Sequence, residues 1–283
     1  MNKAHSYKRK LYLGRVAIYV ILILAAIVCI APFIWMVLTS FKTNAEALRF
    51  PPTIIPHRFI FSNYTNGWTK ADFTLFTRNT LILTLACTIG VVFSSALVGY
   101  GFARFKARGS SIWYIIMLST MMLPSQVTLI PQYLLFHKLV DTYWPMIIPA
   151  WLGGGAFNIF LYTQFFKSLP MELNEAAKID GASSFQTFWQ IMLPSVKPIA
   201  LCVGVMALVY NWNDFFTPLV YLNSTNKYTI AIGLQFLNSS QGNTAKIGIM
   251  MAVSVIVMLP VLVIFLLAQK YFIEGIKISG LKA

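Results

Sequence analysis

Long apolar runs alternate with shorter polar segments along almost the whole chain. A helix needs about 20 predominantly apolar residues to cross a bilayer, and six runs are of this order. They cover residues 16–38, 79–102, 112–136, 144–166, 198–222 and 247–268. The pattern predicts an all-α, polytopic membrane protein whose six transmembrane helices form one domain, residues 16–268.

Two of these runs contain residues that disfavour a straight helix. Prolines, Pro124 and Pro131 among them, lie inside the third and fourth runs, and the fourth also holds three consecutive glycines at residues 153–155. Proline has no N–H to donate and bends a helix. Such bends are tolerated in a membrane where neighbouring helices or a water-filled cavity satisfy the freed backbone groups. We therefore expect both helices to be bent.

Composition supports the membrane class. The chain has 283 residues, of which 58% are hydrophobic and only 11% charged, whereas soluble domains carry roughly 25% charged residues. The net charge of +14 does not indicate nucleic-acid binding, because the basic residues stand at the ends of apolar runs, as membrane topology requires. The first run is too long for a signal peptide and is read as a retained span.

The distribution of Lys and Arg predicts the orientation. Most of the 22 basic residues fall in segments that share one side if the N-terminus is cytoplasmic. Both termini are then cytoplasmic, as tails of residues 1–15 and 269–283, in a multi-pass protein of the cytoplasmic membrane. The polar segment between the fourth and fifth runs, residues 169–197, lies on the same side.

This polar segment predicts two short helices. Pro170 suits the first turn of a helix that Ser168 would cap and Gly181 would end, because glycine accepts the left-handed conformation. Ser183 and Gln186 form a capping box for a second helix. In that helix four residues at helical spacing predict one apolar face: Phe185, Phe188, Trp189 and Met192. The pair is either an amphipathic element on the bilayer surface or a docking site for another protein.

The residues of this segment resemble a known motif. Glu-Ala-Ala-x-x-Asp-Gly-Ala, residues 175–182 with Asn174 before it, followed by Phe185, Phe188 and Leu193-Pro194, looks like the EAA motif of ABC importer permeases. Other stretches, such as residues 100–104 and 211–216, resemble the carbohydrate branch, specifically its maltose-type second permease. The resemblance covers nearly the whole chain.

The resemblance implies that residues 169–197 are a coupling segment that sits in a cleft of a cytoplasmic ATPase subunit. Glu175 would pair with a basic residue there, the next two alanines would form the close-contact surface, and Asp180 and Gly181 would hold the turn. The implied ATPase-coupling residues are Glu175, Ala176, Ala177, Asp180, Gly181 and Ala182. The C-terminal tail also matches and would reach toward the ATPase dimer, with Lys277 in place of a threonine.

The resemblance further implies the partners. These are a second permease subunit in a heterodimer, two ATPase subunits that bind ATP and Mg, and an extracytoplasmic sugar-binding protein. The chain itself shows no Gly-x-x-x-x-Gly-Lys-Ser/Thr phosphate loop and no metal-ligand spacing among its histidines. We therefore expect no cofactor, metal site or catalytic residue in this chain, and transport of a sugar or oligosaccharide rather than an enzymatic activity.

Polar residues inside the runs are candidates for the substrate pathway, because they are expensive in a membrane and usually face a cavity or another helix. The candidates chosen are Gln126, Asn158, Asn211, Asn213 and Asp214, with Gln132 and Gln164 also considered. Hydrogen bonding between helices is the alternative. Residues 223–246 read as a solvated connection, which by resemblance faces the binding protein. A permease for amino acids or peptides, a membrane-embedded enzyme and an ion-coupled carrier are the rival functions.

Overall fold

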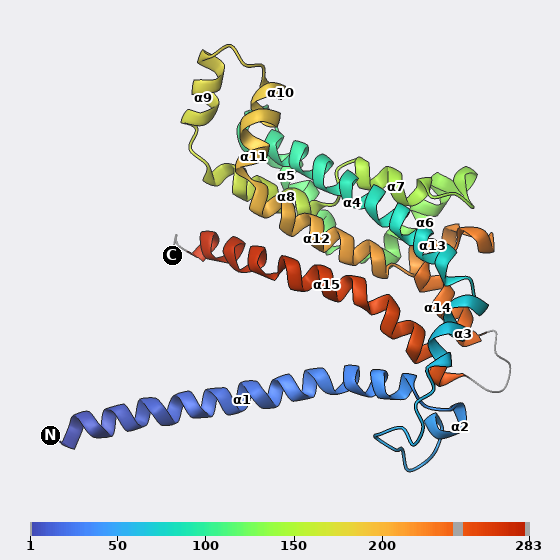
Figure 1. Cartoon of the computed structure of the whole chain (residues 1–283). Helices are drawn as coiled ribbons and strands as arrows, with labels where there is room; N and C mark the ends of the chain where they lie inside the picture. Colours follow the sequence, from blue (N-terminus) through green and yellow to red (C-terminus); the bar gives the residue numbers. More distant parts are fainter. Residues whose placement is uncertain (1, 240–245, 281–283) are drawn as a thin grey trace. The chain divides into compact units, whose positions relative to one another are not determined.

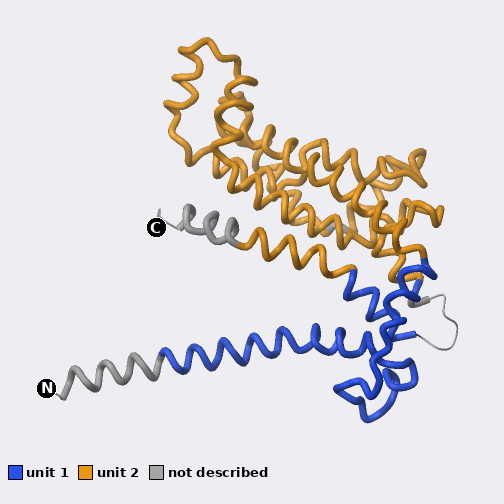
Figure 2. Tube along the Cα trace, viewed as in Figure 1, with its two compact units in different colours: residues 1–71, 237–256 blue, residues 72–236, 257–283 orange. Residues whose placement is uncertain are grey.

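The computed structural model describes the backbone of residues 2–239 and 246–280, and side chains for residues 15–124, 126–237 and 246–269. The described part of the chain contains helices and no strand, which confirms the all-α class. Two compact units can be distinguished, residues 1–71 with 237–256 and residues 72–236 with 257–283 (Figure 2). Each is described separately.

The first unit joins the N-terminal helix to the beginning of the last one. Its helices are α1 (Asn2–Ser40), α2 (Asn44–Ala47), α3 (Ser62–Lys70) and the start of α15 (Ile247–Gly280). The buried Asn63 amide donates to the carbonyls of Ser40 and Lys42, at 2.8 and 2.9 Å. A Cβ on Gly248 would lie only 2.6 Å from the Lys42 carbonyl oxygen. The absence of a side chain at Gly248 therefore lets α15 approach the end of α1 closely.

The second unit is built around α4 (Phe73–Arg104), which packs against α7, α8 and α12 (Figure 1). Small residues of α4 permit this packing, as in other membrane helices. A Cβ on Gly99 would lie 2.7 Å from the Tyr162 Cβ, and one on Gly90 would lie 2.5 Å from the Trp151 ring. The other helices of this unit up to α8 are α5 (Ser110–Ser119), η1 (Thr120–Met122), α6 (Ser125–Phe136), η2 (His137–Leu139), α7 (Trp144–Trp151) and α8 (Ala156–Ser168).

The rest of the second unit contains the coupling segment and the helices that follow it. These are α9 (Glu172–Ile179), α10 (Ser184–Gln186), the π-helix η3 (Thr187–Met192), α11 (Leu193–Ser195), α12 (Lys197–Asn213), α13 (Phe216–Tyr221), η4 (Thr225–Lys227) and α14 (Ile230–Ser239), whose last residues belong to the first unit. Figure 1 shows α9 and α10 at one end of this unit and α13 at the other.

Four described helical segments are long and apolar enough to cross a membrane: Arg15–Ser40, Phe73–Arg104, Trp144–Ser168 and Ile247–Gln269. Two further pairs qualify only if each bent pair is one span. These are Ser110–Met122 with Gln126–Leu139, bent by 108°, and Ser184–Ser195 with Lys197–Asn213, bent by 81°. The structure thus has between four and six spans of this kind.

The predicted bend in the third run is present, whereas the fourth run is interrupted but is not one of the two pairs bent by more than 40°. Pro124 immediately precedes α6 at the 108° bend, whereas Pro131 lies inside α6 without ending it. The fourth run breaks between α7 and α8 at residues 153–155, which have φ of +115°, +64° and +96°. Glycine adopts such values without steric strain. The glycines, and not a proline, therefore separate these two helices.

The fifth run differs from the prediction of one continuous helix over residues 198–222. Pro198 does lie in the first turn of α12, but α12 ends at Asn213. Asp214 has an extended backbone, and its Oδ1 accepts a hydrogen bond from the Thr217 N–H at 3.2 Å. The aspartate therefore caps the separate helix α13 and gives the chain a local alternative to continuing α12.

Residues 223–246 are also not the solvated connection expected from their composition. Within the described part, α14 contributes the buried side chains of Ile230 and Ile232. The Ile230 N–H donates to the Thr80 hydroxyl on α4 at 2.8 Å. Residues 240–245 lie outside the described residues.

Candidate functional site

The coupling segment begins differently from the prediction. Helix α8 continues through Ser168, whose hydroxyl donates to the Phe165 carbonyl at 2.8 Å. The predicted N-cap role of Ser168 is therefore wrong. Leu169 is extended, at φ −76° and ψ 145°, because the residue before a proline avoids the helical region. Pro170 thus ends α8, and α9 starts two residues later at Glu172.

The end of α9 is the glycine turn that the sequence predicted. Gly181 has φ +79°. Its N–H donates to the Lys178 carbonyl at 3.1 Å, and the Ala182 N–H donates to the Ala177 carbonyl at 2.9 Å. These two bonds form a Schellman motif, which satisfies two carbonyls that a helix end would otherwise leave unpaired.

The second predicted helix starts as expected and then continues as a π-helix. Ser183 and Gln186 form the capping box, with both reciprocal bonds present. Residues 187–192 are a π-helix, which needs more residues per turn than an α-helix. Phe188 and Met192 are buried, but Phe185 and Trp189 are 65% and 49% exposed. The rings of Phe185, Phe188 and Trp189 nevertheless adjoin, with centroids 6.4 Å apart in each pair, so the predicted apolar face is present although two of its side chains are exposed.

Two side chains of α4, one helical turn apart, hold this segment. The Arg104 guanidinium donates from Nη2 to the carbonyls of Leu169, at 2.9 Å, and Pro170, at 3.4 Å. The Tyr100 hydroxyl accepts a hydrogen bond from the Asn174 amide of α9 at 3.0 Å. The buried Tyr100 ring also packs against Phe166 and Phe188, with centroids 5.5 and 5.3 Å away. The coupling segment is thus anchored to the helix at the centre of the unit.

The implied coupling residues differ in exposure. Glu175, Ala176, Asp180 and Gly181 are exposed, and Ala182 is half-buried. Ala177 is only 2% exposed, since its side chain faces the interior of its own chain. A hollow of about 450 Å³ behind α9 is bordered by Tyr100, Arg104, Asn174, Glu175 and Lys178 among others. Every residue of α9 except Asn174 and Ala177 is exposed, so Glu175 and Ala176 are accessible together with the turn.

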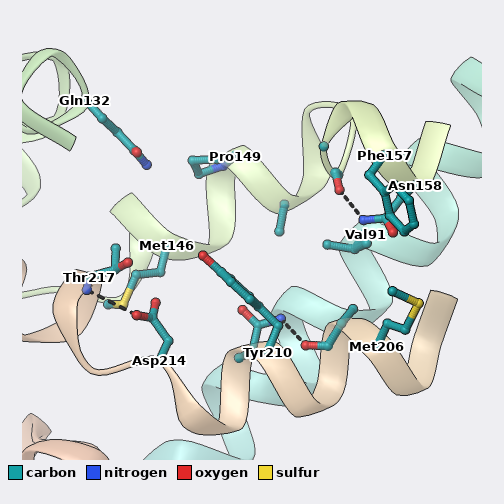
Figure 3. A pocket seen from close by; sticks show the side chains of 15 residues that line it. Val91, Gln132, Met146, Pro149, Phe157, Asn158, Met206, Tyr210, Asp214 and Thr217 are labelled. Atoms are coloured by element: carbon teal, nitrogen blue, oxygen red, sulfur yellow. Dashed lines mark hydrogen bonds between the residues drawn. The ribbon is translucent and has the colours of Figure 1, made fainter. Parts of the chain in front are cut away.

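A second cavity, of about 460 Å³, lies between the helices of the same unit (Figure 3). It is called the membrane cavity below. Its lining residues come from α4, α6, α7, the glycine turn, α8, α12 and α13: Val91, Gln132, Met146, Pro149, Ala150, Gly154, Gly155, Phe157, Asn158, Met206, Ala207, Tyr210, Asn211, Asp214 and Thr217. This volume is in the range of small-molecule sites, about 300–1,000 Å³.

The membrane cavity brings together three of the five chosen pathway residues, Asn158, Asn211 and Asp214. Gln126 and Asn213 are exposed and are not among its lining residues. Asn213 donates instead to the Val209 carbonyl of its own helix at 2.8 Å. Of the other two residues considered, Gln132 lines the cavity, whereas Gln164 lies near the Tyr114 hydroxyl at 3.4 Å.

Tyr210 was not among the predicted residues, although its ring lies in the cavity beside Asp214 in Figure 3. A signal for it exists in the sequence. Tyr210, Asn211 and Asp214 are spaced i, i+1 and i+4, which places them on one side of a helix, whereas Asn213 falls on another. Helical spacing from Asp214 would therefore have selected the tyrosine and rejected Asn213.

At the end of the unit opposite the coupling segment, Asp141 ties two loops together. Its carboxylate accepts hydrogen bonds from the Ser224 hydroxyl at 2.6 Å and the Lys227 ammonium at 2.9 Å, and from the N–H groups of Asn223 and Ser224. The Ser224 hydroxyl, followed by Lys227, holds the pKa of Asp141 well below its usual value. This clamp joins the segment before α7 to the segment before α14.

Fold and site together define a class: a helical membrane protein with a polar cavity between its helices and an exposed, anchored helical arm. Residues 95–278 match a family model described as "Binding-protein-dependent transport system inner membrane component". The probable ABC transporter permease protein YurM of Bacillus subtilis (strain 168) is 33% identical over 278 residues, covering 97% of this chain and 91% of that protein. The chain therefore belongs to the family of binding-protein-dependent transport inner membrane components.

Other comparisons agree with this assignment. The arabinooligosaccharides transport system permease protein AraQ of Bacillus subtilis (strain 168) is 33% identical over 286 residues, covering 98% of this chain and 99% of that protein. A crystal structure of a bacterial ABC transporter involved in the import of the acidic polysaccharide alginate has the same fold, with a TM-score of 0.81 over 93% of this chain and 98% of that one, at 22% identity. The resemblance to ABC importer permeases is confirmed, and the chain is a multi-pass membrane transport subunit.

Proposed function

We propose that this chain is one of two permease subunits of an ABC importer that moves a sugar or oligosaccharide across the cytoplasmic membrane of a bacterium. The permease AraQ, alike over nearly its whole length, is named for arabinooligosaccharide transport. The membrane cavity supports the proposal, because amide, carboxylate and phenol groups stand there beside apolar side chains. Sugars carry hydroxyl groups and apolar C–H faces that suit such a mixture.

The observation that carries the proposal is the exposed turn of α9 anchored on α4. Glu175 and Ala176 are accessible, while Arg104 and Tyr100 hold the segment from behind. An element that is exposed on one side and held on the other can receive a displacement and pass it to the bundle. We assign this role to the implied coupling residues, with ATP and Mg bound by two separate ATPase subunits and both termini in the cytoplasm.

The mechanism then follows from rigid-body motion. Closure of the ATPase subunits on ATP would displace both coupling segments, one in each permease, and rock the two permeases between inward- and outward-open states. An extracytoplasmic sugar-binding protein would deliver the substrate to the outward-open state. This chain's part is to bind the ATPase through α9 and to line the pathway.

The test compares Glu175→Lys with Glu172→Lys in the assembled transporter. Both glutamates are exposed and lie on α9, one turn apart. If Glu175 meets a basic residue of the ATPase, reversing its charge should lower sugar-stimulated ATP hydrolysis and uptake by about tenfold or more, because a buried interface charge is left unpaired. Glu172→Lys should stay near the wild type. Normal activity of both variants would contradict the coupling assignment.

A further inference from the structure

The membrane cavity contains one carboxylate, that of Asp214, and no basic side chain among its described lining residues. We propose that the cavity selects an uncharged, hydroxyl-rich saccharide and rejects an anionic one such as a uronate oligosaccharide. The inference rests on the proposed function, since it names the substrate class of the same site. The fold itself does not decide this point, because a transporter of the same fold is involved in the import of the acidic polysaccharide alginate.

Backbone carbonyls accept hydrogen bonds from three side-chain amides that line the cavity. The Asn158 amide donates to the Gly154 carbonyl and the Asn211 amide to the Ala207 carbonyl, each at 2.7 Å, and the first bond is visible in Figure 3. The Gln132 amide donates to the Pro145 carbonyl at 3.4 Å. A carbonyl oxygen so close to the amide must face the NH₂ group, because two oxygens would repel. Each bond therefore uses one of the two amide N–H groups and leaves the other N–H and the amide oxygen.

Asp214 is the one carboxylate among the described lining residues of the cavity. One of its oxygens, Oδ1, accepts the Thr217 N–H that begins α13. Within the part of the chain that the structure describes, Oδ2 has no hydrogen-bond donor, and an ionised carboxylate can only accept. The Tyr210 hydroxyl, which lies close by in Figure 3, can donate or accept. The three amide oxygens and Asp214 Oδ2 can therefore accept from a ligand, whereas the remaining amide N–H groups and the hydroxyls of Tyr210 and Thr217 can donate to it.

No positively charged side chain among the described lining residues balances the Asp214 carboxylate. None of the described residues that line the membrane cavity is Lys, Arg or His. A ligand carboxylate about 5 Å from Asp214, at an effective dielectric constant of about 20, would lose roughly 100-fold in affinity through repulsion. An anionic saccharide is therefore disfavoured by charge.

A neutral saccharide fits the same surface. Each sugar hydroxyl can donate to an amide or carboxylate oxygen and still accept from another group. The remaining lining residues, among them Met146, Phe157 and Met206, are apolar and can contact the C–H faces of a sugar ring. The combination of scattered acceptors and apolar surface suits a polyhydroxyl ligand better than a small inorganic ion.

The experiment measures equilibrium binding to the assembled transporter in nanodiscs, without the sugar-binding protein. The probes are neutral trisaccharides of glucose, galactose, arabinose, xylose and N-acetylglucosamine, and acidic trisaccharides of galacturonate and of the alginate uronates. We expect at least one neutral probe to bind about 100-fold more tightly than every acidic one. An acidic probe that binds as tightly as the best neutral one would overturn the inference while leaving sugar import intact.

The matched variants are Asp214→Asn and Asp72→Asn. Asparagine keeps the oxygen that accepts the Thr217 N–H, so the α12–α13 junction is retained. Asp214→Asn should reduce the preference for neutral over acidic probes by about 100-fold. Asp72 is exposed and outside the cavity, so Asp72→Asn should leave the preference unchanged. An unchanged preference in Asp214→Asn would also overturn the inference, whereas binding of amines or peptides and of no saccharide would overturn the proposed function as well.

Discussion

The turn at Gly181 provides a quantitative test of the coupling segment. This residue has φ +79°, and a Cβ placed there would meet no atom within 4 Å. Replacement by alanine therefore introduces no clash, and its cost is that of holding an L-residue in the left-handed conformation, about 1–2 kcal/mol. A change of this size lowers the equilibrium ratio of formed to open turn by about 5- to 30-fold.

Hydrogen exchange of the amides at positions 181 and 182 reports this population directly, because both donate into the Schellman motif. In Gly181→Ala these amides should exchange about 5- to 30-fold faster in the assembled transporter, as open forms become more frequent. Uptake per ATP hydrolysed should fall with them, since the end of α9 is no longer fixed.

Gly101→Ala is the matched control. A Cβ at Gly101 also meets no atom within 4 Å, but this glycine lies inside α4. Alanine is favoured over glycine in a helix interior by about 1 kcal/mol, so this variant should be neutral or slightly stabilising. The reasoning is refuted if Gly181→Ala exchanges at the wild-type rate, or if the two variants behave alike.

Two further predictions concern the anchor and the clamp. Arg104→Met removes the bonds to two carbonyls of the coupling segment, each worth about 1.5–3 kcal/mol. Hydrogen exchange in α9 should therefore rise, and ATP hydrolysis should continue without matching uptake. Arg108→Met, in the following loop, is the control, and an equal uptake per ATP hydrolysed in both variants would count against the anchor. The pKa of Asp141 is lowered by the Ser224 hydroxyl and by Lys227, so its contribution to stability is complete above about pH 4 and is lost as the pH falls further toward the folded-state pKa. Melting temperatures should therefore drop more steeply below about pH 4 in the wild type than in Asp141→Asn, and parallel curves would show that the clamp does not stabilise the fold.

Local chemistry made parts of the coupling segment predictable. The capping box at Ser183 and the turn at Gly181 depend on residues within a few positions of each other, so their sequence signals are sufficient. The start of α9 was misplaced because Ser168 can satisfy its hydroxyl inside α8. The π-helix of residues 187–192 was not predictable from an apolar pattern, because such a pattern presupposes the number of residues per turn.

The membrane cavity shows a different limit. Polar residues in apolar runs identified Asn158, Asn211 and Asp214, because burial of such groups in a membrane requires a cavity or a partner. The same criterion also selected Asn213, whose amide is satisfied by its own helix. Sequence spacing gives the face of one helix, but which faces meet depends on packing, including the glycine turn between α7 and α8 that no hydropathy pattern places.

The central claim is that this chain transports sugar only as part of an ATP-driven assembly. The most direct measurement is uptake of a radiolabelled neutral oligosaccharide into proteoliposomes that contain this chain, its partner permease and the ATPase subunits. We predict uptake that requires both ATP on the ATPase side and the sugar-binding protein on the other, and that is lost with inactive ATPase subunits. Uptake by this chain alone, driven by a proton or sodium gradient, would contradict the account.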